Sequence, residues 1–172
     1  MATSALRDLQ KALLPAAVGS LAIVYSNIAN IFAMGKIRYA IKDKEVHPYK
    51  PWADDSPNAE AHFRAYKAFE NGIEWTVLSL PLLWFYVIYT PALPHVGKFL
   101  PWTGTVLAAA FSYYNIKYLE GYTASAAERM PPFKTRTTAV KCLLFGACAG
   151  MASCLASTTG LAKLITPKAC LK

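Results

Sequence analysis

The sequence predicts an all-α membrane protein, a bundle of four transmembrane helices. Hydrophobic residues make up 55% of the 172 residues and charged residues only 16%, whereas a soluble domain usually carries about 25% charged residues. Several long apolar runs approach the ~20 residues that a spanning helix needs. Prolines and basic connections separate these runs. We therefore expect a single integral membrane domain over residues 1–172.

Helices are expected at about residues 8–38, 60–90, 100–128 and 135–165. The uncharged run 12–34 predicts the first helix, and it is longer than the ~7–15 residues of a cleavable signal core. The runs 73–89, 101–116 and 142–161 predict the other helices. Met130-Pro131-Pro132 is expected to separate the third helix from the fourth, because proline interrupts helical hydrogen bonding.

Small residues fill the fourth apolar run. Gly146 and Gly150 form a GxxxG pattern, which lets two helices approach closely. Cys142, Cys148 and Cys154 lie in the same run and are expected to pack as small apolar side chains. Neither the cysteines nor the histidines have metal-ligand spacing, so no metal site is expected.

Basic residues gather in two of the three connections. The net charge is +8, and in a chain this hydrophobic we expect that charge to face anionic lipid rather than nucleic acid. The first connection carries Lys36, Arg38, Lys42, Lys44, Lys50 and Arg64, the third carries Arg129, Lys134 and Arg136, and the second carries only Lys98 and His95. The positive-inside rule therefore places the first and third connections in the cytosol, with both termini on the opposite side.

A polar stripe opens the second predicted helix. Arg64, Lys67, Asn71 and Glu74 are spaced 3, 4 and 3 residues apart, which places them on one helical face. Polar groups at membrane depth are costly and normally face a protein interior or a wet cavity. The alternative is that Arg64 pairs with Glu70, or Lys67 with Glu74, near the lipid headgroups.

A second polar stripe ends the third predicted helix: Tyr118, Tyr122, Ser125 and Arg129 are spaced 4, 3 and 4 residues apart. The alternative is a belt of interfacial tyrosines with an arginine that reaches to the headgroups. Together with Arg38, the two stripes predict a cationic, hydrogen-bonding pocket at the cytosolic boundary of the membrane. Such a pocket suits an anionic, water-soluble cofactor that meets an apolar partner. Asn27 and Asn30 of the first helix are expected to join helices by hydrogen bonds.

The two stripes carry a resemblance to a known family. The pattern Arg64-x-x-Lys67-Ala68-x-x-Asn71-x-x-Glu74, followed by Tyr118-x-x-Gly121-Tyr122-x6-Arg129 and preceded by Gly35-Lys36-Ile37-Arg38, resembles the MAPEG family (membrane-associated proteins in eicosanoid and glutathione metabolism). It is most similar to the branch of the microsomal glutathione S-transferases and leukotriene C4 synthase. The resemblance covers essentially the whole chain.

The resemblance implies a homotrimer in the endoplasmic reticulum or nuclear envelope, with glutathione bound between protomers near the cytosolic face. By position, the residues that would hold glutathione are Arg38, Lys67, Asn71, Glu74, Tyr118 and Tyr122. Arg129 would be catalytic, because a cation beside the thiol lowers its pKa from the usual ~8.5. The thiolate would then attack a hydrophobic electrophile, such as a lipid epoxide or a xenobiotic, or reduce a lipid hydroperoxide.

Several positions depart from the family pattern. Lys67 stands where relatives often have arginine, and Phe69 replaces a glutamine. Trp75 replaces an aromatic residue that is usually tyrosine, and Tyr39 replaces a second arginine. Two other functions stay open from the sequence: a non-catalytic lipid-binding scaffold similar to 5-lipoxygenase-activating protein, and a subunit of an unrelated membrane complex.

Overall fold

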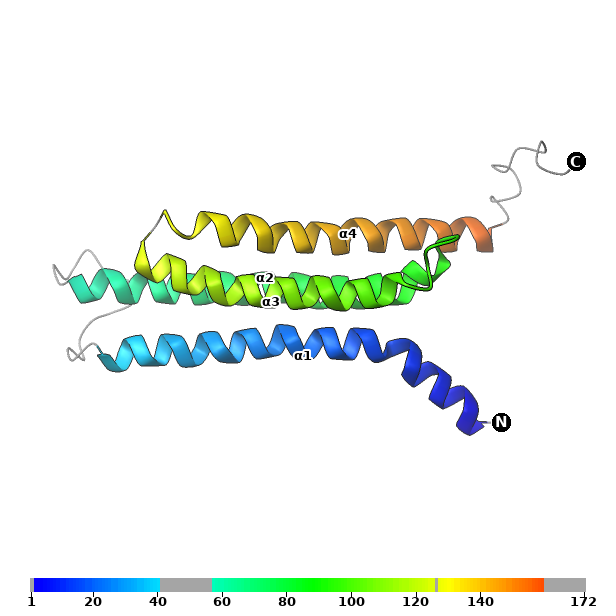
Figure 1. The fold of residues 1–172 in the computed structure, drawn as a ribbon, viewed down its shortest axis with the longest axis horizontal. Coiled ribbons are helices and arrows are strands. Elements are labelled where there is room, and N and C mark those ends of the chain that lie inside the picture. The colour runs from blue at the N-terminus through cyan, green and yellow to red at the C-terminus, as the bar shows by residue number, and fades with distance from the viewer. Residues whose placement is uncertain (1, 41–56, 126, 160–172) are drawn as a thin grey trace, which may run out of the picture.

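The residues that the structure describes form an all-α bundle of four long helices (Figure 1). The computed structural model describes residues 2–40, 57–125 and 127–159. The helices are α1 (Ala2–Ala40), α2 (Pro57–Tyr89), α3 (Leu100–Ala124) and α4 (Met130–Thr158), and the short 3₁₀ helix η2 (Thr90–Ala92) follows α2 directly. The predicted fold class and the order of the helices are confirmed at this level.

The helices α2 and α3 occupy the middle of the bundle, and each of them contacts the other three long helices. α1 and α4 lie on opposite sides of this central pair (Figure 1). The C-terminal end of α1, the N-terminal end of α2 and the turn from α3 to α4 lie together at one end of the molecule. We call this the α3–α4 end. It is the end to which the sequence assigned the basic connections.

The helix boundaries differ from the prediction at the turn between α3 and α4. α3 ends at Ala124, because Ser125 is extended, and α4 already begins at Met130. Pro131 and Pro132 therefore start a helix rather than separate two helices. Proline fits the first turn because its missing N–H has no helical acceptor there. Some positions lie outside the described residues: residue 165, where this helix was predicted to end, the cysteine at position 170, and the lysines 42, 44 and 50 of the first connection.

Within the described residues, three helices are long and apolar enough to cross a membrane: the segments Ser4–Tyr39, Glu60–Ala92 and Met130–Thr158. The sequence predicted four such spans, and α3 is not among these three. Much of the outer surface is apolar; Leu21 and Phe145, for example, are each 71% exposed. Apolar surface of this extent is suited to lipid or to a protein partner. The chain is therefore a candidate multi-pass membrane protein.

Two apolar clusters build the interior. The larger one joins all four helices and includes Ile23, Leu83, Phe111 and Leu143, which are fully buried. The smaller one, Ala68, Tyr118 and Leu119, lies toward the α3–α4 end. Between these two clusters each helix contributes buried polar side chains, among them Ser26, Thr76, Asn115 and Arg136, so a polar layer crosses the bundle there.

The GxxxG pattern of α4 packs against α2, which confirms that small residues here allow a close approach. A Cβ atom on Gly146 would lie 2.6 Å from Cδ2 of the Tyr86 ring. A Cβ atom on Gly150 would lie 2.6 Å from the carbonyl oxygen of Tyr89. Both distances are below any normal carbon contact, so only glycine fits at these two positions without displacement of α2.

Candidate functional site

The centre of the polar layer is Arg136 of α4, whose side chain is fully buried. Its Nη1 donates to Oδ1 of Asn115 on α3, and its Nη2 donates to Oδ1 of Asn71 on α2, each at 2.6 Å. No ion pair to Arg136 occurs among the residues that the structure describes. A cation buried inside an apolar bundle is costly unless its donors are satisfied. Two amide oxygens from neighbouring helices accept from its terminal nitrogens, whereas its buried Nε has no hydrogen-bond partner in the described part of the chain.

The polar layer continues into α1. Nδ2 of Asn115 donates to Oγ of Ser26 at 3.3 Å and to Oδ1 of Asn27 at 3.5 Å. The Asn27 side chain then links α1 to α2, because its Nδ2 donates to Oγ1 of Thr76 at 2.8 Å. We define the polar layer by these side chains: Ser26, Asn27, Asn71, Thr76, Asn115 and Arg136. The expectation that Asn27 joins helices is confirmed. Asn30 is also buried, but its Oδ1 has no hydrogen-bond partner in the described part of the chain.

Aromatic rings surround the buried guanidinium. Its central carbon lies 4.3 Å from the ring centroid of Tyr118, 5.5 Å from that of Phe133 and 5.7 Å from that of Trp75. A guanidinium is attracted to the negative face of an aromatic ring. The three rings therefore add favourable contacts to the two hydrogen bonds that hold the Arg136 guanidinium.

The second predicted stripe is brought together by two segments rather than by one helix. Tyr118 and Tyr122 lie on α3 with their ring centroids 5.8 Å apart. Arg129 lies in the turn just before α4, and its guanidinium carbon lies 4.8 Å from the Tyr122 ring centroid. The prediction that Ser125 and Arg129 share a face of the third helix was wrong, because that helix ends at Ala124. The turn instead brings Arg129 to the Tyr122 ring.

The first predicted stripe lies on α2, but its charges pair differently from the predicted alternatives. Arg64 pairs with Glu60, and Nζ of Lys67 pairs with Oε2 of Glu70 at 2.7 Å. Nδ2 of Asn71 donates to Oε2 of Glu74 at 3.4 Å. The pairings Arg64–Glu70 and Lys67–Glu74 are therefore wrong. Both observed ion pairs are local to the helix, at spacings of four and three residues, which hold neighbouring side chains together.

The structure thus joins five of the seven predicted site residues into one chain of contacts through Arg136: Glu74, Asn71, Tyr118, Tyr122 and Arg129. Lys67 lies one helical turn before Asn71 on α2. Arg38 lies exposed in the last turn of α1, and within the described ranges no hydrogen bond joins it to these five.

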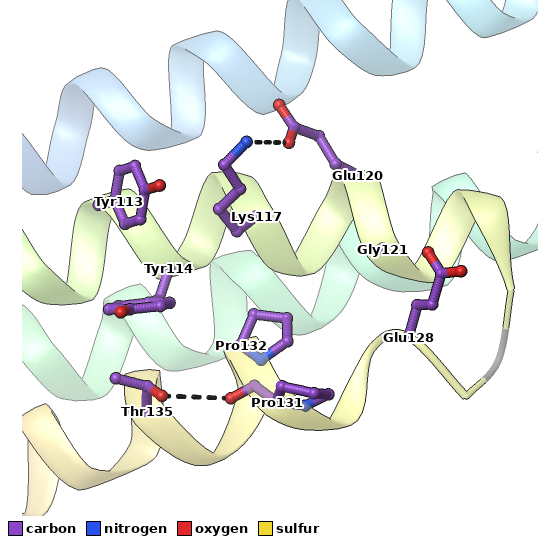
Figure 2. Close-up of a pocket in the computed structure, with 9 residues that line it drawn as sticks. All are labelled: Tyr113, Tyr114, Lys117, Glu120, Gly121, Glu128, Pro131, Pro132 and Thr135. Atoms are coloured by element: carbon purple, nitrogen blue, oxygen red, sulfur yellow. Dashed lines mark hydrogen bonds and ion pairs between the residues drawn. The ribbon is translucent and has the colours of Figure 1, made fainter.

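Two hollows lie elsewhere on the surface. Figure 2 shows the first, about 680 Å³, between α3 and the start of α4, where Nζ of Lys117 pairs with Glu120 at 2.7 Å. The second, about 450 Å³, is an apolar groove between α2 and α4 that Trp75, Leu78 and Val140 help to line. None of the seven predicted residues lines either of these two hollows.

Sequence reasoning missed Arg136 and Asn115. Arg136 was counted with the charges of the third connection because the fourth apolar run begins only at Cys142, although the predicted helix 135–165 includes it. A signal was available: Asn115 lies three residues before Tyr118, so the two share a helical face. With Asn115 included, the polar stripe on this face of α3 extends farther from the α3–α4 end than the two tyrosines alone.

No model of a protein family matches the chain, and no curated protein gives a significant match. The fold and the site define a class: an all-α membrane-type bundle with a buried cationic and amide-rich layer, which reaches a cluster of tyrosine and arginine side chains at the α3–α4 end.

Proposed function

We propose that this chain is a glutathione-dependent membrane transferase of the microsomal glutathione S-transferase type, in keeping with its resemblance to the MAPEG family. The observation that carries the proposal is the contact of Arg129 with Tyr122, next to the contacts among Tyr118, Arg136 and Asn71. Guanidinium, phenol and amide groups from three segments thus gather at one end of an apolar bundle. Few functions need such a group of donors beside a lipid-suited surface.

The chemistry of glutathione matches these side chains. Its two carboxylates need cations, which Arg38 and Lys67 supply, and its ammonium needs a carboxylate, which Glu74 supplies. The amide of Asn71 and the hydroxyls of Tyr118 and Tyr122 suit its peptide groups. Lys67 forms an ion pair with Glu70 in the single chain, so ligand binding would exchange one carboxylate partner of this lysine for another.

The catalytic residue in this proposal is Arg129. Its cation would stabilise the thiolate and lower the thiol pKa from ~8.5 by about 1–3 units. The sulfur would then form a bond to the electrophilic carbon of an epoxide, and the carbon–oxygen bond would break and leave an alkoxide that takes a proton. Reduction of a lipid hydroperoxide would use the same thiolate: the sulfur would attack the outer peroxide oxygen, and the oxygen–oxygen bond would break and leave a lipid alkoxide that takes a proton. The thiol of a second glutathione would then displace water from the sulfenic acid and form the disulfide.

The proposal includes a homotrimer in the endoplasmic reticulum or nuclear envelope, with the active site toward the cytosol. Support for a shared site comes from the single chain. Arg38 is separate from the contact chain, and none of the seven residues lines either of the two hollows described above. A neighbouring protomer would supply the missing wall, and the apolar outer faces of the helices would admit a hydrophobic electrophile from the membrane.

The test uses the full chain purified in detergent. Calorimetry measures glutathione binding, ultraviolet difference absorbance measures thiolate, and a chlorodinitrobenzene electrophile measures conjugation. Arg129→Ala is expected to return the thiol pKa toward its ordinary value, so that at pH 7 the thiolate falls to a few per cent and recovers as the pH rises above the thiol pKa. Lys98→Ala removes an exposed lysine before α3, at the other end of the bundle, and should change nothing.

The opposing results are equally specific. If the wild-type protein binds no glutathione at millimolar concentration, the proposed glutathione-dependent enzymatic function is wrong. If the same protein bound lipid amphiphiles but no glutathione, the alternative function, a non-catalytic lipid-binding scaffold, would replace the enzymatic one. Thiolate that survives in Arg129→Ala would remove Arg129 from the catalytic role and leave glutathione binding intact.

A further inference from the structure

The orientation of the Asn71 amide is determined by its neighbours. A guanidinium has only donors, so the group that Asn71 turns toward Arg136 must be its oxygen. Oδ1 of Asn71 indeed accepts from Nη2 of Arg136 at 2.6 Å, and Nδ2 of Asn71 donates to Oε2 of Glu74 at 3.4 Å. Asn71 therefore presents its oxygen to the interior and its two N–H donors to the partly exposed side of α2.

Arg136 is itself held rigidly. Its Nη1 is bound to Asn115 and its guanidinium lies 4.3 Å from the Tyr118 ring centroid. The side chain is fully buried, and a planar guanidinium loses little freedom when several partners bind it. A shift of Arg136 would therefore move both the Asn71 amide and the Tyr118 ring, which belong to different helices.

We infer that Arg136 is a positioning residue for the proposed glutathione site, where it directs the donors of Asn71 and the ring of Tyr118 toward the ligand. The inference rests on the proposed function. It also specifies what Asn71 recognises: an acceptor of the ligand, a peptide carbonyl or carboxylate oxygen. Arg136 does not touch the ligand or the reacting sulfur.

The experiment uses S-methylglutathione as the probe, because its binding does not depend on thiol ionisation. Calorimetry on the full chain compares wild type, Arg136→Gln and the control Lys134→Gln, which changes an exposed cation on the same helix. Glutamine is shorter than arginine and carries both of its N–H donors on one nitrogen, so it cannot hold both amide oxygens where the two terminal nitrogens of Arg136 hold them. Arg136→Gln should raise the Kd about tenfold, the value of one hydrogen bond, and leave the number of binding sites per chain unchanged. Lys134→Gln should bind like wild type.

A purely structural role gives a different result. Arg136→Gln would then unfold a fraction of the protein, which lowers the number of binding sites per chain while the remaining sites keep the wild-type Kd. That outcome would overturn the inference.

Asn71→Asp provides a second route if Arg136→Gln does not fold. Aspartate keeps an acceptor for Arg136 but cannot donate to the ligand, so its Kd should rise by about tenfold or more, with thermal stability retained. Thr135→Asp adds the same charge at an exposed position of α4 and controls for repulsion. An Asn71→Asp protein that binds like wild type would overturn the inference, whereas a wild type that does not bind would also overturn the proposed function.

Discussion

The guanidinium of Arg136 and the amide oxygen of Asn71 meet at 2.6 Å, although 65 positions separate them in the sequence. The contact joins α4 to α2, and the second amide of the pair, Asn115, belongs to α3. One buried side chain thus fixes the relative register of three helices. Because a helix cannot slide without breaking this contact, the polar layer specifies the arrangement of the bundle as well as the geometry of the candidate site.

The first prediction concerns the stability of this layer. Asn115→Leu removes the acceptor of Arg136 Nη1 and should lower the free energy of unfolding by about 2–4 kcal/mol, since it leaves a buried cation partly unsatisfied. Adding Arg136→Met to Asn115→Leu should recover part of that loss, because the buried charge is then absent. Titration with a denaturing detergent measures both. If the losses in free energy of unfolding from Asn115→Leu and Arg136→Met simply added in the double variant, the two residues would not be energetically coupled.

The sequence predicted the fold well because helix formation depends on local patterns. Apolar run lengths and prolines were enough to predict four helices in the right order. They failed at the turn between α3 and α4. There Pro131 and Pro132 serve equally well to stop a helix or to start one, and only the cap geometry of the folded chain decides between them.

The candidate site was predicted in part for a related reason. Tyr118 and Tyr122 share one helix, so their spacing alone brings them together. The position of Arg129 beside Tyr122 depends on the turn, and the contact from Arg136 to Asn71 depends on the packing of α4 against α2. Ion-pair partners were mistaken because the pairs that were considered, Arg64 with Glu70 and Lys67 with Glu74, lie six and seven residues apart. The pairs that form lie four and three residues apart, on the same side of the helix.

The second prediction concerns the close approach of α4 to α2. A Cβ atom at position 150 would lie 2.5 Å from the carbonyl carbon of Tyr89, which is backbone and cannot turn aside. Gly150→Ala should therefore lower the free energy of unfolding by about 1–3 kcal/mol. Gly35→Ala on α1 is the matched control: its Cβ atom would meet nothing within 4 Å, and it should raise stability by up to about 1 kcal/mol through helix propensity. Equal effects of the two changes would refute the close contact.

The third prediction concerns the charge that Glu74 supplies to the proposed ligand. Glu74→Gln should weaken glutathione binding by about tenfold or more, because a hydrogen bond between charged groups contributes about 1.5–3 kcal/mol. Calorimetry with a glutathione analogue that lacks the ammonium makes the test specific: wild type and Glu74→Gln should bind the analogue equally. Glu120→Gln, which breaks the ion pair with Lys117 on α3, should bind glutathione normally. Equal weakening with both ligands would assign Glu74 another role.

The last prediction decides whether α3 crosses the membrane. α3 is not among the three helices that are apolar enough by themselves, yet it lies between α2 and α4 in the chain, and Lys98 and Lys134 are exposed on either side of it. If α3 spans, these two positions lie on opposite faces of the membrane, with position 134 in the cytosol by the positive-inside rule.

Single cysteines at these positions provide the measurement. Lys98→Cys and Lys134→Cys are made in a chain whose four natural cysteines are replaced, and sealed microsomes are treated with a membrane-impermeant maleimide. Position 134 should react in intact vesicles, and position 98 only after detergent opens them. Reaction of both from the outside would place both ends of α3 on one face. That result would contradict the four-span topology from which the cytosolic orientation of the proposed site was inferred. With only three spans, the N-terminus and the C-terminus of the chain would lie on opposite sides of the membrane.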